Sequence, residues 1–319
     1  MYDTPLFQKI LVARDFSDSA ASALAQAVWL ARQTGGEITV AHAIPLTQDT
    51  MATFSSNPWY VASNAQEIEQ RLHHSADKRL SETIAPYRAS GVNFSYRTLW
   101  GTPFIELIHT VEEEDFDLVV VGTRGLSAVS RFLIGSTATR LIRKCPCPVW
   151  TVKQGAQQGL ASVLAPVDFS EISRQSLQMA GELAARAGAA LHVLHVLSGT
   201  HEYALDILGD ETDFDARTRR RIERRETLDR MHEFVGTQIS VQPTYIVERG
   251  EAWKRILAVS RRVEADLTVM GTVGRGGVTG LLIGNTAEKV LHSGHGSLLA
   301  LKPAGFISPV QPRGMAAVV

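Results

Sequence analysis

The strongest constraint on how this chain folds is an internal repeat. The segment Ile10-Leu-Val-Ala-Arg-Asp15-Phe-Ser17 returns 153 positions later as Val163-Leu-Ala-Pro-Val-Asp168-Phe-Ser170. Toward the end of each copy the offset is 149, as between Gly122 and Gly271. A repeat of this length indicates two copies of one domain rather than a single large domain. The 319 residues therefore divide into a first domain (residues 1–153), a second domain (residues 160–302) and a tail (residues 303–319).

Each copy alternates apolar strands with amphipathic helices. In the first copy we expect strands at residues 10–13, 38–44, 94–99, 118–121 and 149–153, with helices between them. This alternation predicts an α/β fold, in which each domain is a doubly wound, Rossmann-like unit with a five-stranded parallel sheet. Ser17 or Asp18 can cap the first helix, and the pair Gly35-Gly36 can end it. The tail is rich in proline and glycine, so we expect it to be mobile.

The composition excludes several classes of protein. The 32 basic and 33 acidic residues give a net charge of −1, which argues against a dedicated nucleic-acid binder. No apolar run approaches the roughly 18 residues of a membrane span, and the first residues lack the pattern of a signal peptide. Two cysteines cannot make a disulfide framework. We therefore expect a cytoplasmic protein with no membrane or nucleic-acid partner.

The most informative motif follows the fourth predicted strand of each copy. The first copy has Gly122-Thr-Arg-Gly125, then nine residues, then Gly135-Ser136-Thr137. The second has Gly271-Thr-Val-Gly274, nine residues, and Gly284-Asn285-Thr286. Glycines let backbone amides approach an anion closely, and a helix start adds free N–H groups and the positive end of the helix dipole. The motif therefore predicts a phosphate site in each copy.

An aspartate follows the first strand of each copy. Asp15 and Asp168 lie where a doubly wound sheet binds ligands, beyond the carboxyl ends of its strands. A carboxylate there can accept hydrogen bonds from a sugar hydroxyl or a base amino group. Glycines at strand–helix junctions are often only turns, but the motif and the aspartate recur together in both copies. We therefore favour a nucleotide site, with copy two the weaker match because Asn285 replaces serine.

These motifs resemble the universal stress protein family, whose units of about 150 residues carry Gly-x2-Gly-x9-Gly-(Ser/Thr) near the fourth strand. The similarity covers residues 6–153 and 160–302, and it includes the run Cys145-Pro-Cys-Pro-Val149. The tandem arrangement is most similar to the E type of this family. The resemblance implies ATP as the ligand, with or without Mg²⁺, a regulatory role in the stress response, and pairing of the strands at residues 149–152 and 298–301 within the chain. It also leaves open a homodimer.

The resemblance also implies which residues contact the nucleotide. The base and ribose would be contacted by residues at the ends of the first two strands: Ala13, Asp15 and Ala43 in copy one, and Pro166, Asp168 and Val196 in copy two. The ribose would lie against Gly122 and Gly271. The phosphates would be held by Gly125, Gly135, Ser136 and Thr137 in copy one, and by Gly274, Gly284, Asn285 and Thr286 in copy two.

Other chemistries find less support. The chain has no Gly-Lys of a Walker loop, no Gly-x-Ser-x-Gly and no His-Glu-x-x-His. We expect Cys145 and Cys147 to pack rather than react, and the spacing of His292 and His295 to be no metal site. For His42 and His195, which recur at strand ends, a structural hydrogen bond is favoured over catalysis.

The basic run at residues 217–226 reads as a solvated helix face, with a docking patch for an acidic partner or nucleic acid as the alternative. No general base stands out, so catalysis is expected to be absent or limited to weak ATP hydrolysis. Two alternatives stay open at this point. One is a module that binds a lipid or a small metabolite, and the other is an ATP-using transferase, which the fold alone does not exclude.

Overall fold

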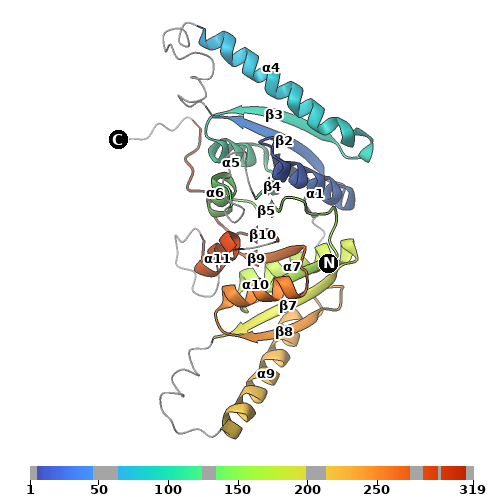
Figure 1. Cartoon of the computed structure of the whole chain (residues 1–319), viewed down its shortest axis with the longest axis vertical. Coiled ribbons are helices and arrows are strands. Elements are labelled where there is room, and N and C mark those ends of the chain that lie inside the picture. Colours follow the sequence, from blue (N-terminus) through green and yellow to red (C-terminus); the bar gives the residue numbers. More distant parts are fainter. Residues whose placement is uncertain are drawn as a thin grey trace, which may run out of the picture. The chain divides into compact units, whose positions relative to one another are not determined.

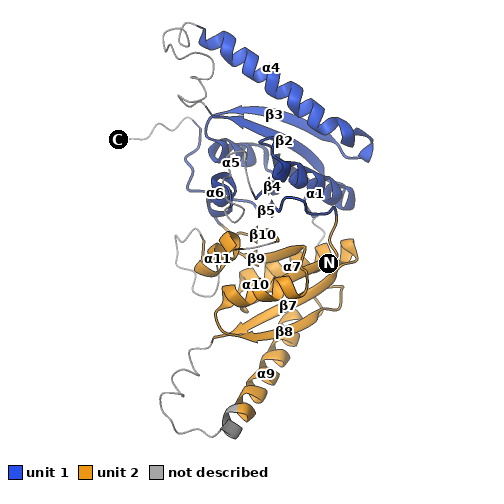
Figure 2. Cartoon of the chain, viewed as in Figure 1, with its two compact units in different colours: residues 1–158, 306–319 blue, residues 159–305 orange. Residues whose placement is uncertain are grey.

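A computed structural model describes residues 6–45, 64–123, 134–198, 213–273, 283–293 and 296–313, which form two compact units (Figure 1). Unit 1 comprises residues 1–158 and 306–319, and unit 2 comprises residues 159–305 (Figure 2). Each unit contains one copy of the repeat, and the end of the chain belongs to unit 1.

The sheet of unit 1 is parallel, with the strand order β3-β2-β1-β4-β5. Its strands are β1 (Lys9–Ala13), β2 (Glu37–Ile44), β3 (Phe94–Trp100), β4 (Leu118–Gly122) and β5 (Val149–Val152). Every residue of β4 and β5 is buried. Continuous apolar strands of this kind are typical of a sheet that is covered on both faces. The α/β fold that the repeat predicts is thus confirmed.

In the described residues, four α-helices connect these strands. They are α1 (Asp18–Thr34), α4 (Ala65–Ile84), which continues into the 3-10 helix η1 (Ala85–Ser90), α5 (Pro103–Glu114) and α6 (Ser136–Lys144). Right-handed crossovers place α1 and α4 on one face of the sheet and α5 and α6 on the other. The contacts of α1 with η1 and of α5 with α6 agree with this arrangement.

Unit 2 has the same topology, with the strand order β10-β9-β6-β7-β8. Its strands are β6 (Ser162–Pro166), β7 (Ala190–Leu197), β8 (Thr244–Arg249), β9 (Leu267–Gly271) and β10 (Ser297–Leu301). Its helices are α7 (Glu171–Ala187), α9 (Asp213–Val235), α10 (Ala252–Arg262) and α11 (Asn285–Ser293). No helix in the described part of the chain is long and apolar enough to span a membrane.

Local sequence signals determine where the first helix of each unit starts and stops. The Ser17 hydroxyl accepts a hydrogen bond from the Ala20 amide at 3.2 Å, so Ser17 rather than Asp18 caps α1. Gly35 ends this helix with a φ of 75°, a conformation that glycine adopts without steric cost. Ser170 caps α7 in the same way as Ser17 caps α1. The start of each of these helices is therefore fixed next to the aspartate that precedes it.

The segment after Lys302 returns to unit 1. Although its composition predicts mobility, residues up to Arg313 make specific contacts with α5. Nε2 of His109 lies 2.8 Å from the Gln311 carbonyl, and Arg313 forms ion pairs with Glu106 and Glu113. These partners are about 200 positions apart in the sequence, so no local pattern could have predicted them.

Candidate functional site

The strand order of each sheet reverses beside its first strand. In unit 1, β1 lies between β2 and β4, with Ala13 opposite Ala41 on one side and Val121 on the other. Unit 2 repeats this arrangement around β6, which lies between β7 and β9. The connecting helices leave such a reversal on opposite faces, so the carboxyl ends of these strands border the crevice where doubly wound proteins bind ligands.

A tight Asp-Phe-Ser turn forms one side of this crevice in each unit. In unit 1, Oδ1 of Asp15 accepts hydrogen bonds from the Ser17 amide at 3.0 Å and from the Ser17 hydroxyl at 2.6 Å. Oδ2 of Asp15 makes no hydrogen bond to a described residue and so remains available to a ligand. In unit 2, Asp168 accepts the same two hydrogen bonds from Ser170.

The central phenylalanine of this turn is strained. Phe16 and Phe169 both have a φ of 64°, a left-handed conformation that is uncommon for a bulky residue. Such a conformation costs on the order of 1–3 kcal/mol and persists only where the surroundings impose it. The same strain at the same place in both units indicates that the turn serves to orient the aspartate.

The repeated histidines hold this turn from the neighbouring strand. Nδ1 of His42 donates to the Arg14 carbonyl at 2.7 Å, and its ring lies 4.6 Å from that of Phe16. In unit 2, His195 makes the same contacts with the Val167 carbonyl and with Phe169. Burial lowers the pKa of His42, so the ring is neutral near pH 7. The predicted structural hydrogen bonds are therefore present in both units.

An arginine from the long helix of each unit covers the phenylalanine ring. Cζ of Arg79, on α4, lies 3.7 Å from the Phe16 ring centre, and Cζ of Arg230, on α9, lies 4.1 Å from that of Phe169. Both side chains are exposed, and each places a positive charge beside the crevice through a cation–π contact. Sequence reasoning missed these arginines because the repeat does not align them. They are 151 positions apart, whereas the repeat offsets are 153 and 149.

The first glycine of each motif has a packing role. A Cβ added to Gly122 would lie 2.5 Å from Oγ of Ser19 and 2.8 Å from the backbone nitrogen of Ala20. A Cβ on Gly271 would lie 2.5 Å from Cγ1 of Ile172. The end of the fourth strand thus touches the first turn of α1 or α7, and only glycine leaves room for that approach. Contact of these glycines with a ribose stays a prediction.

The last glycine of each motif joins the strand to the next helix. The amide of Gly135 donates to the Thr123 carbonyl at 2.8 Å, and that of Gly284 donates to Thr272. These two amides are therefore engaged within the chain. No side chain of a described residue caps α6, so the amides of Ser136, Thr137 and Ala138 are available as donors for an anion at the helix start.

The structure brings most of the predicted site residues to the same edge of each sheet. The residues at the ends of the first two strands are Ala13, Asp15 and Ala43 in unit 1, and Pro166, Asp168 and Val196 in unit 2. The residues at the fourth strand and the following helix are Gly122, Gly135, Ser136 and Thr137 in unit 1, and Gly271, Gly284, Asn285 and Thr286 in unit 2. Gly125 and Gly274 lie outside the described residues.

Cys145 and Cys147 lie at the end of α6. Their sulfur atoms are 3.6 Å apart, and both side chains are buried. A hydrogen bond with Cys145, together with burial, raises the pKa of the Cys147 thiol well above its usual value. Because the thiolate is the reactive form, this geometry supports the predicted packing role.

The other candidate residues form no further site in the described part of the chain. There, no three His, Cys, Asp or Glu side chains are grouped so that they could hold a metal ion. His292 lies on α11, and His295 lies outside the described residues. The basic run lies on α9, with the arginines from Arg217 to Arg225 exposed, as expected for a solvated helix face.

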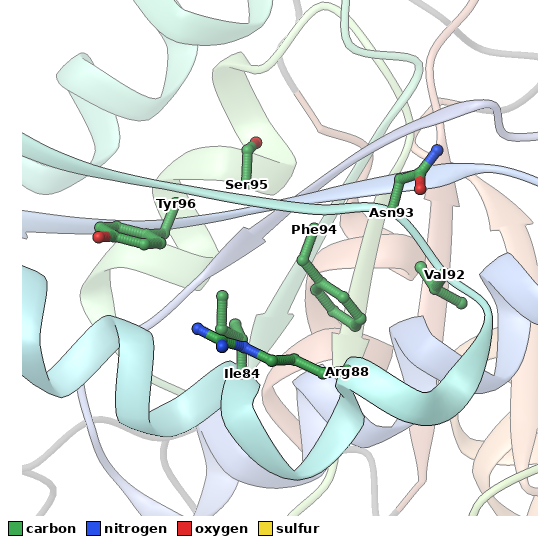
Figure 3. A pocket seen from close by; sticks show the side chains of 7 residues that line it. All are labelled: Ile84, Arg88, Val92, Asn93, Phe94, Ser95 and Tyr96. Carbon is green, nitrogen blue, oxygen red and sulfur yellow. The ribbon is translucent and has the colours of Figure 1, made fainter.

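A hollow of about 500 Å³ lies beside β3, away from the crevice. In Figure 3, Phe94 points toward the helical segment that carries Ile84 and Arg88, and Ser95 points to the other side of the strand. A second hollow, of about 240 Å³, lies near the beginnings of β1, β2 and β3. None of the predicted nucleotide-site residues lines either hollow, and we assign no ligand to them.

Comparisons with known proteins agree with this architecture. The chain is similar over 96% of its length to Universal stress protein E of Escherichia coli (strain K12), with 27% identity and 97% of that protein covered. It is similar to Universal stress protein E of Photorhabdus laumondii at 24% identity, with 96% of this chain and 98% of that protein covered. Among solved structures, a putative universal stress protein from Pseudomonas aeruginosa UCBPP-PA14 matches with a TM-score of 0.65 at 22% identity, over 94% of each chain. This structural likeness supports the fold alone.

The family model named Universal stress protein family matches residues 6–153 and again residues 160–302. The two matches coincide with the two copies of the repeat, and each contains one Asp-Phe-Ser turn and one crevice. The predicted resemblance is therefore confirmed, and the chain belongs to the universal stress protein family, with two tandem domains.

Proposed function

We propose that this chain acts in the stress response as a binder of adenine nucleotides, with ATP as the ligand. One observation carries the proposal. In both units, a fixed carboxylate and a helix start lie on opposite sides of the same reversal in strand order. A carboxylate at one end and free amides at the other suit a ligand that combines hydroxyl or amino donors with phosphate.

Each part of the site has a distinct task in this proposal. In unit 1, Oδ2 of Asp15 accepts a hydrogen bond from the ribose or the base. The amides of Ser136, Thr137 and Ala138 donate to phosphate oxygens, and the Ser136 hydroxyl adds a further donor. The contact between the Phe16 and His42 rings keeps the aspartate in place while the ligand enters and leaves.

The same residues favour binding over rapid turnover. His42 is neutral and engaged with a backbone carbonyl, and Asp15 is held by Ser17, so neither is arranged as a general base. A Mg²⁺ ion that accompanies ATP would take most of its ligands from phosphate and water, with Asp15 as the candidate carboxylate of unit 1. Slow hydrolysis, driven by neutralised phosphates, is the limit of the activity we propose.

We propose that the two sites differ in strength. In unit 1, β1 pairs with β4 over four positions, from Ile10 to Ala13. In unit 2, β6 pairs with β9 only at Val163 and Leu164. Pro166 stands where unit 1 has Ala13, and it has no N–H to donate to the neighbouring strand. The strands β6 and β9 therefore separate closer to their starts than β1 and β4 do, which widens the second crevice. Unit 1 is therefore the tighter nucleotide site in this proposal.

We also retain two proposals about the surroundings of the sites. The strands β5 and β10 each end the strand order of their own unit, and pairing them within the chain would remove two exposed edges. Sedimentation at several concentrations distinguishes such a monomer from a homodimer.

The two free cysteines suit a reducing compartment, and we propose the cytoplasm as the location.

Replacing Ser136 by proline tests the phosphate cradle. Proline at the first position of a helix removes one amide donor without disturbing the helix, and Gly135 has the extended backbone, with ψ of 149°, that a following proline requires. A hydrogen bond to a charged group contributes about 1.5–3 kcal/mol. Titration calorimetry should therefore show ATP binding to unit 1 at least tenfold weaker in Ser136→Pro.

Ser136→Ala is the matched control, because it removes the hydroxyl and keeps the amide. It should weaken binding less than Ser136→Pro does. Asn285→Pro makes the equivalent change in unit 2 and identifies which transition of the titration belongs to which unit. The proposal is wrong if the unmodified protein binds no ATP, or if both proline variants bind it as tightly as the unmodified protein.

A further inference from the structure

The outer face of α5 carries three polar side chains in line. Glu106, His109 and Glu113 are spaced three and four residues apart, so they lie on one side of the helix. The side chain of Glu106 is only 16% exposed, and His109 is 8% exposed. Gly101 leaves room for Glu106, because a Cβ there would lie 2.7 Å from its Oε1. We call these three residues the α5 docking face.

The end of the chain lies along this face and matches its chemistry. One guanidinium nitrogen of Arg313 lies 2.7 Å from Oε2 of Glu106, and the other lies 2.9 Å from Oε2 of Glu113. The two carboxylates are seven residues apart on the helix, and the planar, forked guanidinium donates to both of them at once. Nε2 of His109 donates to the Gln311 carbonyl at 2.8 Å, since a carbonyl can only accept.

The docked segment is short and contains two prolines. It reads Ser308-Pro-Val-Gln-Pro312-Arg313, and its two prolines fix the backbone and lower the entropy lost on docking. Ile307 is 85% exposed, whereas Phe306 and Val310 are half-buried, so polar contacts set the position of the segment and apolar contacts add to them. Arg313 and Glu113 are themselves about half exposed, and such ion pairs are individually weak and are screened by salt. The contact is therefore specific in geometry but easily released.

We propose that the α5 docking face is a recognition surface for a proline-containing peptide that carries an arginine, and that residues 306–313 of the same chain occupy it as a releasable strap. A peptide of the same chemistry competes with the strap for the carboxylates of Glu106 and Glu113. Occupation by the chain's own end is favoured because the tether supplies a high effective concentration. This inference is independent of nucleotide binding.

Brief digestion of the full chain with trypsin tests the strap. Trypsin cleaves after Arg313 and removes residues 314–319, a loss that intact mass measures directly. A guanidinium held by two carboxylates is protected, so Glu106→Gln together with Glu113→Gln should speed this cleavage about tenfold. Arg97→Met is the matched control, because it breaks the separate pair between Arg97 and Glu114 near the same helix. It should leave the cleavage rate unchanged.

A binding measurement tests the surface itself. In Arg313→Glu the strap is repelled by Glu106 and Glu113, so a fluorescent peptide of residues 306–319 should bind this variant at least tenfold more tightly than the unmodified chain. Adding Glu106→Gln and Glu113→Gln to that variant should abolish the gain. Equal cleavage rates in the first experiment, or no peptide binding to Arg313→Glu, would overturn the proposal. Dimers of the unmodified chain that dissociate on Arg313→Glu would instead assign the face to a second copy, and the strap would then be wrong.

Discussion

Gly122→Ala should destabilise unit 1 because the new methyl group has no space. It would lie 2.5 Å from Oγ of Ser19, 2.6 Å from its carbonyl carbon and 2.8 Å from the nitrogen of Ala20. Two of these three atoms belong to the backbone of the first turn of α1, so a side-chain rotation cannot relieve the clash. The helix start must move by roughly 1 Å to restore normal contact distances.

The size of the effect follows from two opposing terms. Overpacking in a close-packed interior costs about 1–3 kcal/mol, and contact with backbone atoms places Gly122 near the upper end. The φ of Gly122 is not positive, so alanine can adopt the same backbone conformation. Alanine also restricts the unfolded chain, which raises the free energy of unfolding by about 0.4–1 kcal/mol. The net loss is about 2 kcal/mol. For a domain of this size, that lowers the Tm of unit 1 by roughly 4–8 °C.

Differential scanning calorimetry of the nucleotide-free protein measures this loss, and Gly284→Ala is the matched control. A Cβ on Gly284 would lie 3.4 Å from the Thr272 carbonyl oxygen, an ordinary contact, so that variant should unfold within about 1 kcal/mol of the unmodified protein. Gly271→Ala should fall between the two, because the nearest atom, at 2.5 Å, belongs to the Ile172 side chain, and the nearest backbone atom, the Val273 carbonyl oxygen, is 3.2 Å away. Equal stability of Gly122→Ala and Gly284→Ala would refute the packing role of Gly122.

Three further predictions concern the turn and the buried groups. Ser17→Ala removes the cap of α1 and should lower the free energy of unfolding by about 1 kcal/mol in urea titrations, whereas Ser22→Ala, inside the same helix, should cost less. Burial and the nearby charge of Arg79 lower the pKa of His42, so the free energy of unfolding that depends on the neutral ring is fully present above pH 6.5 and falls as the pH drops below it. Arg79→Met should raise the His42 pKa in an NMR titration, and an unchanged pKa would contradict the position of Arg79 beside the turn. Iodoacetamide should leave Cys147 unmodified in the native protein at pH 8 and alkylate it after unfolding, so rapid native labelling would contradict its burial and raised pKa.

The sequence predicts well those features that depend on local pattern. The apolar run at residues 118–121 is a buried strand, Gly35 ends α1, and Ser17, one of the two predicted candidates, caps that helix. Each of these depends on residues that are close together in the chain, so periodicity and capping rules are sufficient. The repeat adds a further constraint, since any element inferred in one copy must also suit the other.

Contacts between distant segments leave no such pattern. Arg79 meets Phe16 only because α4 crosses back over the turn, and its counterpart Arg230 occupies a different place in the repeat numbering. A proline-rich composition predicts a mobile tail, yet the position of Arg313 relative to two glutamates on α5 decides where that segment lies. Such contacts are set by tertiary structure, and they are where sequence reasoning fails for this chain.

Comparison of the two units distinguishes the features that both crevices share from those that occur in one unit. Both units retain the strained phenylalanine, the histidine whose ring contacts it and an arginine over its ring, although the arginines come from helices of unlike sequence. Each arginine comes from the helix between the second and third strands of its unit, so a cation beside the turn recurs in both units. The docked chain end and the buried cysteine pair occur in unit 1, where the repeat supplies no counterpart in unit 2. A ligand common to both crevices should therefore depend on the shared turn, and differences between the two sites should arise from features that only one unit carries.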